Sequence, residues 1–398
     1  MPEKKIAIIG GGAAGLMAAD MLSRHGEVHI YEKGKALGRK FLVAGNGGFN
    51  LTNSAEGEDL CRKYTPMEFL QPALEAFNSQ DTRTWLAGLG IPTFVGSSGR
   101  VFPEKGIKPI TVLQQIKDRL LQNGVQFHFQ HEFVGFNAEQ KPILKFQESE
   151  CFPEADHYLF ALGGASWPVT GSTGNWLEAF RLSGIKTLAF QSSNCGINVN
   201  WPDDFRNKFG GAPLKNLQVS AGNFSLKGEA LITDYGLEGN VIYPLVPKIR
   251  ELLQAGKEAF LTLDFKPQNT VGQLLEKVRG KQIQTKNYEQ VFKLSKAQLT
   301  LLKAFSSKED YVFPENFVRQ IKQLTIPVSS LRPIEEAIST AGGISLEEVN
   351  PDFTLKAFPH ISVVGEMLDW DAPTGGFLLQ GCFSTAYLAA QAILVKLR

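Results

Sequence analysis

The sequence of 398 residues has little cysteine, and its cysteines are not paired in any short motif. Cys61, Cys151, Cys195 and Cys382 stand far apart, with no C-x-x-C. This spacing argues against a zinc site and against a dithiol that exchanges electrons with a cofactor, and it is typical of a reduced, cytoplasmic protein. The six histidines form no ligand pattern either, so we expect no metal.

An excess of charge of one sign is also missing. Forty-one basic and 40 acidic residues are well mixed and give a net charge of +1. No basic stripe indicates a nucleic-acid partner. The apolar stretch at 6–19 is broken by three consecutive glycines and is too short to span a bilayer, so no membrane partner is expected. The first strand begins near Lys4, which leaves no room for a signal peptide.

The most informative segment that is present lies at 4–32. An apolar run, Lys4 to Ile9, is followed by Gly10, Gly12 and Gly15 in the pattern G-x-G-x-x-G. An amphipathic helix and a second apolar run come next. Strand, glycine turn, helix and strand together predict a dinucleotide-binding βαβ unit, in which the helix N-terminus faces a diphosphate.

Glu32 ends the second strand of this unit. A carboxylate there can accept hydrogen bonds from both ribose hydroxyls, and it would repel a 2′-phosphate, which argues against NADP at this site. Beyond it, residues 34–53 carry many glycines and no clear periodicity, which is typical of a binding loop. We interpret Arg39 and Lys40, within this loop, as cations that neutralise the diphosphate.

Two later segments favour FAD over NAD. A buried strand at 360–369 carries Gly365 and Glu366, a pair that can reach a ribityl chain. A helix then starts near Gly376 and Phe377, and its N-terminal amides can stabilise negative charge on a reduced flavin. Paired glycines at 163–164 end another buried strand and let the backbone pass close to the cofactor.

These observations predict an α/β protein in which one fold is interrupted by another. The FAD-binding domain covers 1–189 and 335–398. An inserted β-barrel-like domain covers 190–267 and 324–334. A polar, helical subdomain at 268–323 is nested inside the insert.

The chain resembles the BaiN-like family of NAD(P)/FAD-dependent oxidoreductases, which are bacterial flavoproteins. The resemblance is carried by IIGGGAAGLMAA (8–19), GRKFLVAGNGGFNLTN (38–53), LGGASWPVTGSTGNW (162–176), STAGGISLEEVN (339–350) and VVGEMLDWDAPTGGF (363–377). The more familiar branch has an arginine-cysteine pair where this chain has Gly48 and Phe49, and an asparagine where it has Leu378, which indicates a sub-branch.

The resemblance implies a glutathione-reductase-type fold and a set of residues that contact non-covalent FAD. These are Gly10, Gly12, Ala13, Ala14, Gly15, Glu32, Lys33, Arg39, Lys40, Asn46, Gly47, Gly48, Phe49, Asn50, the Phe133 backbone, Gly163, Gly365, Glu366, Gly376, Phe377 and Leu378.

No residue is singled out as catalytic, because a flavin can transfer hydride without a protein acid. The function we expect is reduction of a small, apolar organic substrate, such as an enone at its C=C bond, with NAD(P)H binding transiently as donor. The alternatives are a flavin-dependent RNA-modifying protein and a flavin-binding sensor without turnover. Lys277, Arg279, Lys281 and Lys286 would then be the candidate RNA face, although Glu276 and Glu289 lie among them. We also expect the insert to cover the flavin, with 268–323 at the periphery.

Overall fold

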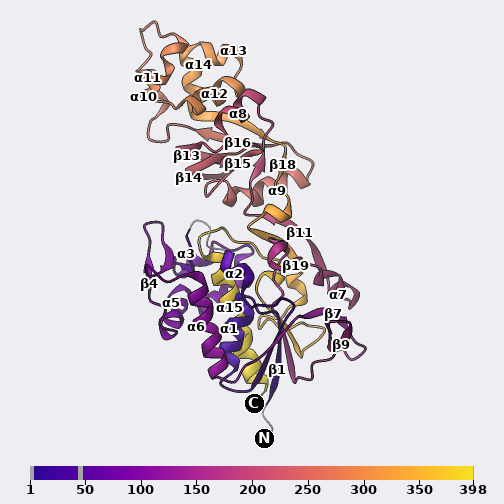
Figure 1. The fold of residues 1–398 in the computed structure, drawn as a ribbon. Coiled ribbons are helices and arrows are strands. Elements are labelled where there is room, and N and C mark those ends of the chain that lie inside the picture. The colour runs from indigo at the N-terminus through magenta and orange to yellow at the C-terminus, as the bar shows by residue number, and fades with distance from the viewer. Residues whose placement is uncertain (1–3, 44–47, 398) are drawn as a thin grey trace. The chain divides into compact units, whose positions relative to one another are not determined.

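The computed structural model describes residues 4–43 and 48–397, and the chain divides into two compact units. The first unit consists of 1–191 and 338–398, and the second of 192–337. In Figure 1 the first unit therefore contains both the indigo and the yellow end of the chain. Each unit has a hydrophobic core of its own.

A five-stranded sheet, parallel throughout, forms the centre of the first unit. Its order is β20 (Ile361–Val363), β10 (His157–Phe160), β1 (Lys5–Ile9), β2 (Glu27–Glu32) and β6 (Gln126–Phe129). β10 and β20 are buried along their whole length, which is why these strands are continuous apolar runs rather than alternating ones. The predicted α/β class is confirmed.

Two apolar helices pack against each other beside this sheet. α1 (Ala13–Leu22) follows the glycine turn, and α15 (Phe377–Lys396) ends the chain. Figure 1 shows α1, α15 and α6 lying side by side. The other helices of the unit are α2 (Arg39–Val43), α3 (Gly57–Cys61), α4 (Met67–Ala76), α5 (Ser79–Gly88), α6 (Pro109–Gln122) and α7 (Trp176–Leu182). By length and composition α15 could cross a membrane, but Phe383, Ala386 and Ala389 belong to the core of the unit.

Three small sheets complete the first unit. They are β3 (Thr52–Asn53) with β5 (Arg100–Pro103) and β4 (Thr93–Val95), β7 (His131–Phe136) with β8 (Pro142–Phe146) and β9 (Ser149–Cys151), and β11 (Thr187–Ser193) with β19 (Ser339–Ile344). Apolar and polar residues alternate over 124–136, and this pattern predicts a strand and its continuation. The chain instead turns at Gln130, whose φ of 61° lies in the left-handed region, so β6 and β7 belong to different sheets.

The second unit is built on a seven-stranded sheet whose paired strands are antiparallel. Its order is β17 (Leu324–Val328), β16 (Ala259–Asp264), β13 (Pro213–Ala221), β14 (Phe224–Ile232), β15 (Gly236–Glu238), β12 (Ile197–Asn198) and β18 (Ser330–Leu331). Its later helices are α10 (Val271–Leu275), α11 (Tyr288–Phe292), α12 (Lys296–Phe305), α13 (Lys308–Val312) and α14 (Pro314–Gln323).

The strand-like character predicted for 190–265 missed two helices, α8 (Asp203–Phe209) and α9 (Val246–Gln254). Both have sequence features that favour a helix start: two aspartates in the first turn of α8, and Pro247 at the beginning of α9. The helices of 268–323 share one core with the sheet, because Leu274 and Phe317 belong to the same cluster as Leu261. The finer domain boundaries expected from the sequence stay predictions.

A buried polar network fixes α15 to the rest of the first unit. Gln380, which is fully buried, accepts hydrogen bonds through Oε1 from the hydroxyls of Thr52 and Thr82, both at 2.7 Å. Its Nε2 donates to the Phe77 carbonyl at 2.9 Å and to Ser384 Oγ at 3.0 Å. The network therefore joins the start of α15 to β3 and α5.

We predict that Gln380→Leu lowers the free energy of unfolding by about 2–4 kcal/mol, because two buried hydroxyls lose their acceptor. Urea denaturation followed by circular dichroism measures the change. Gln114→Leu is the matched control, since Gln114 bonds Asp118 on the exposed face of α6. Equal stability of the two variants would contradict the prediction.

Candidate cofactor-binding site

The three glycines of the turn after β1 have different surroundings. At Gly10, where φ is 111°, a Cβ atom would overlap the Ala161 carbonyl of β10. At Gly15 it would overlap the Gly10 carbonyl, so only glycine lets α1 pack this closely on β1. A Cβ on Gly12 would meet no atom within 4 Å. Gly12 faces the open space of a pocket.

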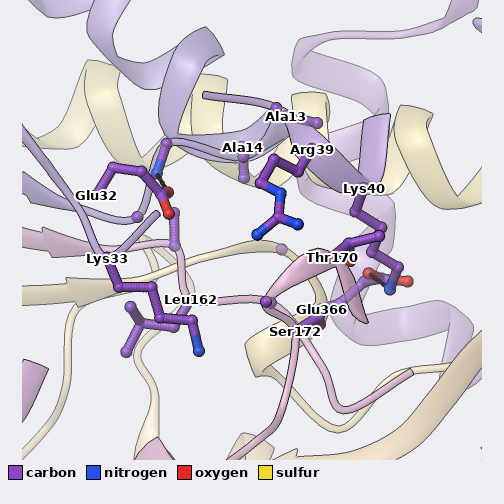
Figure 2. Close-up of a pocket in the computed structure, with 18 of the residues that line it drawn as sticks. Ala13, Ala14, Glu32, Lys33, Arg39, Lys40, Leu162, Thr170, Ser172 and Glu366 are labelled. Atoms are coloured by element: carbon purple, nitrogen blue, oxygen red, sulfur yellow. Dashed lines mark hydrogen bonds and ion pairs between the residues drawn. The ribbon is translucent and has the colours of Figure 1, made fainter. Parts of the chain in front are cut away.

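This pocket lies beyond the carboxyl ends of the parallel strands, where open α/β sheets bind their ligands. Figure 2 shows it with Glu32 and Lys33 toward one end, Lys40 and Glu366 toward the other, and Arg39 between them. The pocket is long and crosses the N-terminus of α1. That shape suits an extended dinucleotide.

Glu32 is held at its end of the pocket by two backbone groups. Its Oε2 accepts the Gly11 N–H at 2.9 Å and its Oε1 accepts the Gly34 N–H at 2.7 Å. Each carboxylate oxygen has a further lone pair, so both can accept another donor. Tyr31 lines the pocket next to Glu32, and burial, with smaller contributions from Cys151, Tyr158 and Glu27, raises its pKa to about 12.

Three cations lie along the pocket. Lys33 Nζ donates to Thr173 Oγ1 at 3.2 Å, and Arg39 donates to the Val169 carbonyl at 2.9 Å. Lys40 Nζ donates to Ser166 Oγ at 2.8 Å and to Glu366 Oε2 at 2.9 Å. Each cation keeps N–H donors that these bonds do not use. Phosphate oxygens would be natural partners for those donors.

The N-terminus of α15 forms the other end of the site. Gly376 has a φ of 100°, and a Cβ there would overlap the backbone of Thr52. The amide of Asn50, oriented to satisfy both neighbours, accepts the Gly376 N–H and donates to the Gly48 carbonyl at 3.2 Å. Cys382 lines the pocket one turn further on, and burial raises its pKa well above the usual range; Glu366 adds to this and Lys40 opposes it. Cys382 is therefore a thiol.

Most of the predicted contact residues line this one pocket. They are Gly10, Gly12, Ala13, Ala14, Glu32, Lys33, Arg39, Lys40, Phe133, Gly163, Gly365, Glu366 and Leu378. Gly15, Gly48, Phe49, Asn50, Gly376 and Phe377 are not among its lining residues. Asn46 and Gly47 lie outside the described residues. The contacts of all these residues with FAD stay predictions.

Sequence reasoning missed one side of the pocket. The segment 166–173 contributes Thr170, Gly171, Ser172 and Thr173, and β7 contributes His131 and Glu132. A run of hydroxyl residues and glycines directly after the paired glycines at 163–164 could have indicated the first group. Nothing in the sequence indicates His131, which reaches the site only because the chain turns at Gln130.

The residues present fit a bound flavin dinucleotide. α1 begins at the pocket without a side-chain cap, so its first N–H groups are free to meet an anion. The three cations supply the countercharge, and Glu32 supplies the acceptors that ribose hydroxyls require.

Comparison with known proteins decides the family. The family model described as the HI0933-like protein Rossmann domain matches residues 4–392. The chain belongs to the HI0933-like family. The resemblance inferred from the motifs and the Rossmann-type FAD-binding fold are thereby confirmed.

Two curated relatives align over nearly their whole length. The chain is 26% identical to the 3-dehydro-bile acid delta(4,6)-reductase of Clostridium scindens, with 98% of each chain covered. It is 23% identical to the ribosomal RNA dihydrouridine synthase of Haemophilus influenzae, with 97% of each covered. The predicted class of this HI0933-like protein, an FAD-dependent oxidoreductase, agrees with both.

Among solved structures, the 3-ketosteroid-delta4-(5alpha)-dehydrogenase of Rhodococcus jostii RHA1 has a similar fold. The TM-score is 0.50 at 12% identity, and 99% of this chain and 98% of that one are covered. The 3-ketosteroid delta1-dehydrogenase of Sterolibacterium denitrificans gives a TM-score of 0.50 at 11% identity, covering 99% and 100%. At these identities the likeness concerns the fold.

We predict that Glu32→Gln weakens FAD binding by about 1–3 kcal/mol, the value of a charge-assisted hydrogen bond. Titration of the apo-protein with FAD measures the change in affinity. In the variant, the NH2 group of glutamine would face one of the backbone N–H groups that Glu32 accepts, which could destabilise the protein itself. The thermal unfolding temperature of the ligand-free variant is therefore the control. Unchanged affinity would show that Glu32 does not bind the cofactor.

Proposed function

We propose that this HI0933-like protein binds FAD non-covalently and uses it to reduce a C=C bond of a small, apolar substrate, with NAD(P)H as a transient donor. The observation that carries the proposal is the pocket that joins Glu32, the uncapped N-terminus of α1, three cations and the N-terminus of α15. On this proposal, the predicted contact residues that line the pocket would form one binding surface for FAD.

A bound flavin supplies hydride transfer in both half-reactions. The residues of this chain bind and orient it. Arg39 and Lys40 neutralise the diphosphate, and Glu366 accepts a hydroxyl while it holds Lys40. The N-terminus of α15 would supply N–H groups and the positive end of a helix dipole to negative charge on a flavin bound there. Cys382, as a buried thiol, contributes no charge.

The relatives support the type of reaction. Loss of delta(4,6) double bonds and conversion of uridine to dihydrouridine both add hydrogen across a C=C bond. The reduced flavin would supply the hydride for this addition and water would supply the proton. NAD(P)H would then reduce the oxidised flavin again by transfer of another hydride. Leu378 and Leu379, which line the pocket at the start of α15, support an apolar substrate.

We predict that acid releases FAD from the purified protein, and that NADH or NADPH bleaches the bound flavin in anaerobic solution. Addition of a 3-keto steroid with a delta-4 double bond then restores the oxidised spectrum. Recovery of FMN would contradict the cofactor, and absence of bleaching with either nucleotide would favour a sensor without turnover. Reoxidation by uridine-containing ribosomal RNA, but not by the steroid, would favour the second candidate below.

A cluster of lysines supports RNA as the second candidate substrate. Residues 268–323 contain ten basic and five acidic residues. Lys266 Nζ donates to the Lys293 carbonyl at 2.7 Å, and Lys281 Nζ donates to the Lys277 carbonyl at 3.2 Å. Burial lowers the pKa of Lys266, and the charges of Lys277 and Lys293 add to the effect. These four lysines form the basic cluster.

The sequence suggested that nearby carboxylates neutralise this region. In the structure Glu276 pairs with Arg279 at 3.0 Å, and among the described residues no carboxylate forms an ion pair with the basic cluster. Uncompensated lysines on one surface fit the phosphates of RNA. The interpretation of Lys277, Arg279, Lys281 and Lys286 as a solvated face stays a prediction.

If ribosomal RNA is the substrate, replacing Lys277, Lys281 and Lys293 by alanine weakens RNA binding for all sequences. The slope of log affinity against log salt then falls by about 1 for each phosphate that the variant no longer neutralises. Lys248→Ala is the matched control, because Lys248 is paired with Glu251 at 2.8 Å in the same unit. An unchanged slope in the triple variant, or no RNA binding by the wild type at low salt, would exclude this candidate.

A cytoplasmic location and a bacterial source are parts of the same proposal. The reduced state of four scattered cysteines supports the first. The bacterial origin of both curated relatives supports the second.

A further inference from the structure

The segment 166–173 crosses the cofactor pocket on the side opposite the three cations. Its Thr170, Ser172 and Thr173 line the pocket, and Figure 2 shows Arg39 reaching from α2 toward Thr170 and Ser172. The segment includes a short 3-10 helix at Pro168–Thr170. Residues far away in sequence determine its position.

The three cations that line the pocket, Lys33, Arg39 and Lys40, each form a hydrogen bond with this segment. Lys33 bonds the Thr173 hydroxyl, Arg39 bonds the Val169 carbonyl, and Lys40 bonds the Ser166 hydroxyl. These three hydrogen bonds therefore span the pocket at three successive places. The hydroxyl of Ser166 continues the connection by donating to the Ile338 carbonyl at 3.1 Å.

Local geometry alone would not favour this conformation. Trp167 has φ and ψ of 58°, which is the left-handed region that a bulky side chain rarely adopts. Val169, two residues further along the chain, is 77% exposed, so burial of its side chain does not hold the 3-10 helix in place. Three hydrogen bonds that hold the segment come from the cations, and Ser172 Oγ donates another to the Gly164 carbonyl at 2.7 Å.

The same cations are those assigned to the diphosphate. Lys40 Nζ has three N–H donors and uses two, on Ser166 and Glu366, and Arg39 keeps most of its five. A diphosphate can therefore bond the cations while their bonds to the segment persist. Its negative charge would also relieve the repulsion among three cations that lie along one pocket.

We propose that the segment 166–173 is the outer wall of the diphosphate site, and that the diphosphate and the three cations hold it in place together. The inference rests on the proposed binding of FAD and adds Ser166 and Thr173 as cofactor-retaining residues. By linkage, whatever stabilises the segment in this position raises the affinity for the cofactor, and a bound diphosphate stabilises the segment to the same extent.

Hydrogen exchange followed by mass spectrometry tests the wall directly. We expect FAD to slow exchange of the amides in 166–173 on the order of tenfold, and ADP, which has the diphosphate but no flavin, to slow it as well. Adenosine, which lacks phosphate, should leave exchange unchanged. FAD binding with no change in 166–173 would overturn the inference while leaving the proposed function intact. Failure of FAD and ADP alike to bind would overturn both.

Two variants test the contribution of the hydroxyls. Ser166→Ala with Thr173→Val removes two of the three acceptors, and we expect FAD to dissociate about tenfold faster. Ser183→Ala with Thr84→Val is the control, because these hydroxyls bond only carbonyls of their own helices. An equal change in both pairs would overturn the inference. If the test pair does not fold, the exchange experiment on the wild type still decides.

Discussion

Close approach of backbone to backbone at three glycines determines the rest of the first unit. Gly10 lies against the Ala161 carbonyl, Gly15 against the Gly10 carbonyl, and Gly376 against Thr52. A Cβ at any of these positions would push two elements apart. Without it, the N-termini of α1 and α15 both reach the carboxyl edge of the parallel sheet. Because two helix N-termini converge there, the site has many N–H donors before any charged side chain is added.

The charged side chains of the pocket add selectivity to the anion binding that the helix N-termini provide. Donors at a helix N-terminus favour an anion but do not choose among anions. Glu32, held by the N–H groups of Gly11 and Gly34, adds acceptors and negative charge at one end, so the pocket favours a ligand with hydroxyls there and phosphates further along. Lys40 and Glu366 hold each other at 2.9 Å, which fixes both heads without closing the pocket.

The parts of the fold that depend on neighbouring residues could be predicted from the sequence. The unit from β1 to β2 was predictable because strand, turn, helix and acid follow one another within 30 residues. The turn at Gln130, which separates β6 from β7, was not, since no glycine or proline stands there. The role of 166–173 was not predictable either, because its hydrogen bonds join residues 126 to 140 positions apart. Local patterns contain no information on such pairs.

The names of the two curated relatives indicate different substrates, a bile acid and ribosomal RNA, and this difference is compatible with one fold that binds the same cofactor. A flavin adds hydrogen to a C=C bond whether that bond is in a steroid or in a uracil ring, so the pocket of the first unit can remain the same while the substrate changes. Selectivity must then come from surfaces outside the dinucleotide site. In this chain residues 268–323 carry a surplus of five basic residues. A neutral steroid would gain nothing from that positive charge, whereas a polyanion would be attracted by it, so the basic residues of 268–323 would bear on the choice between the two substrate classes.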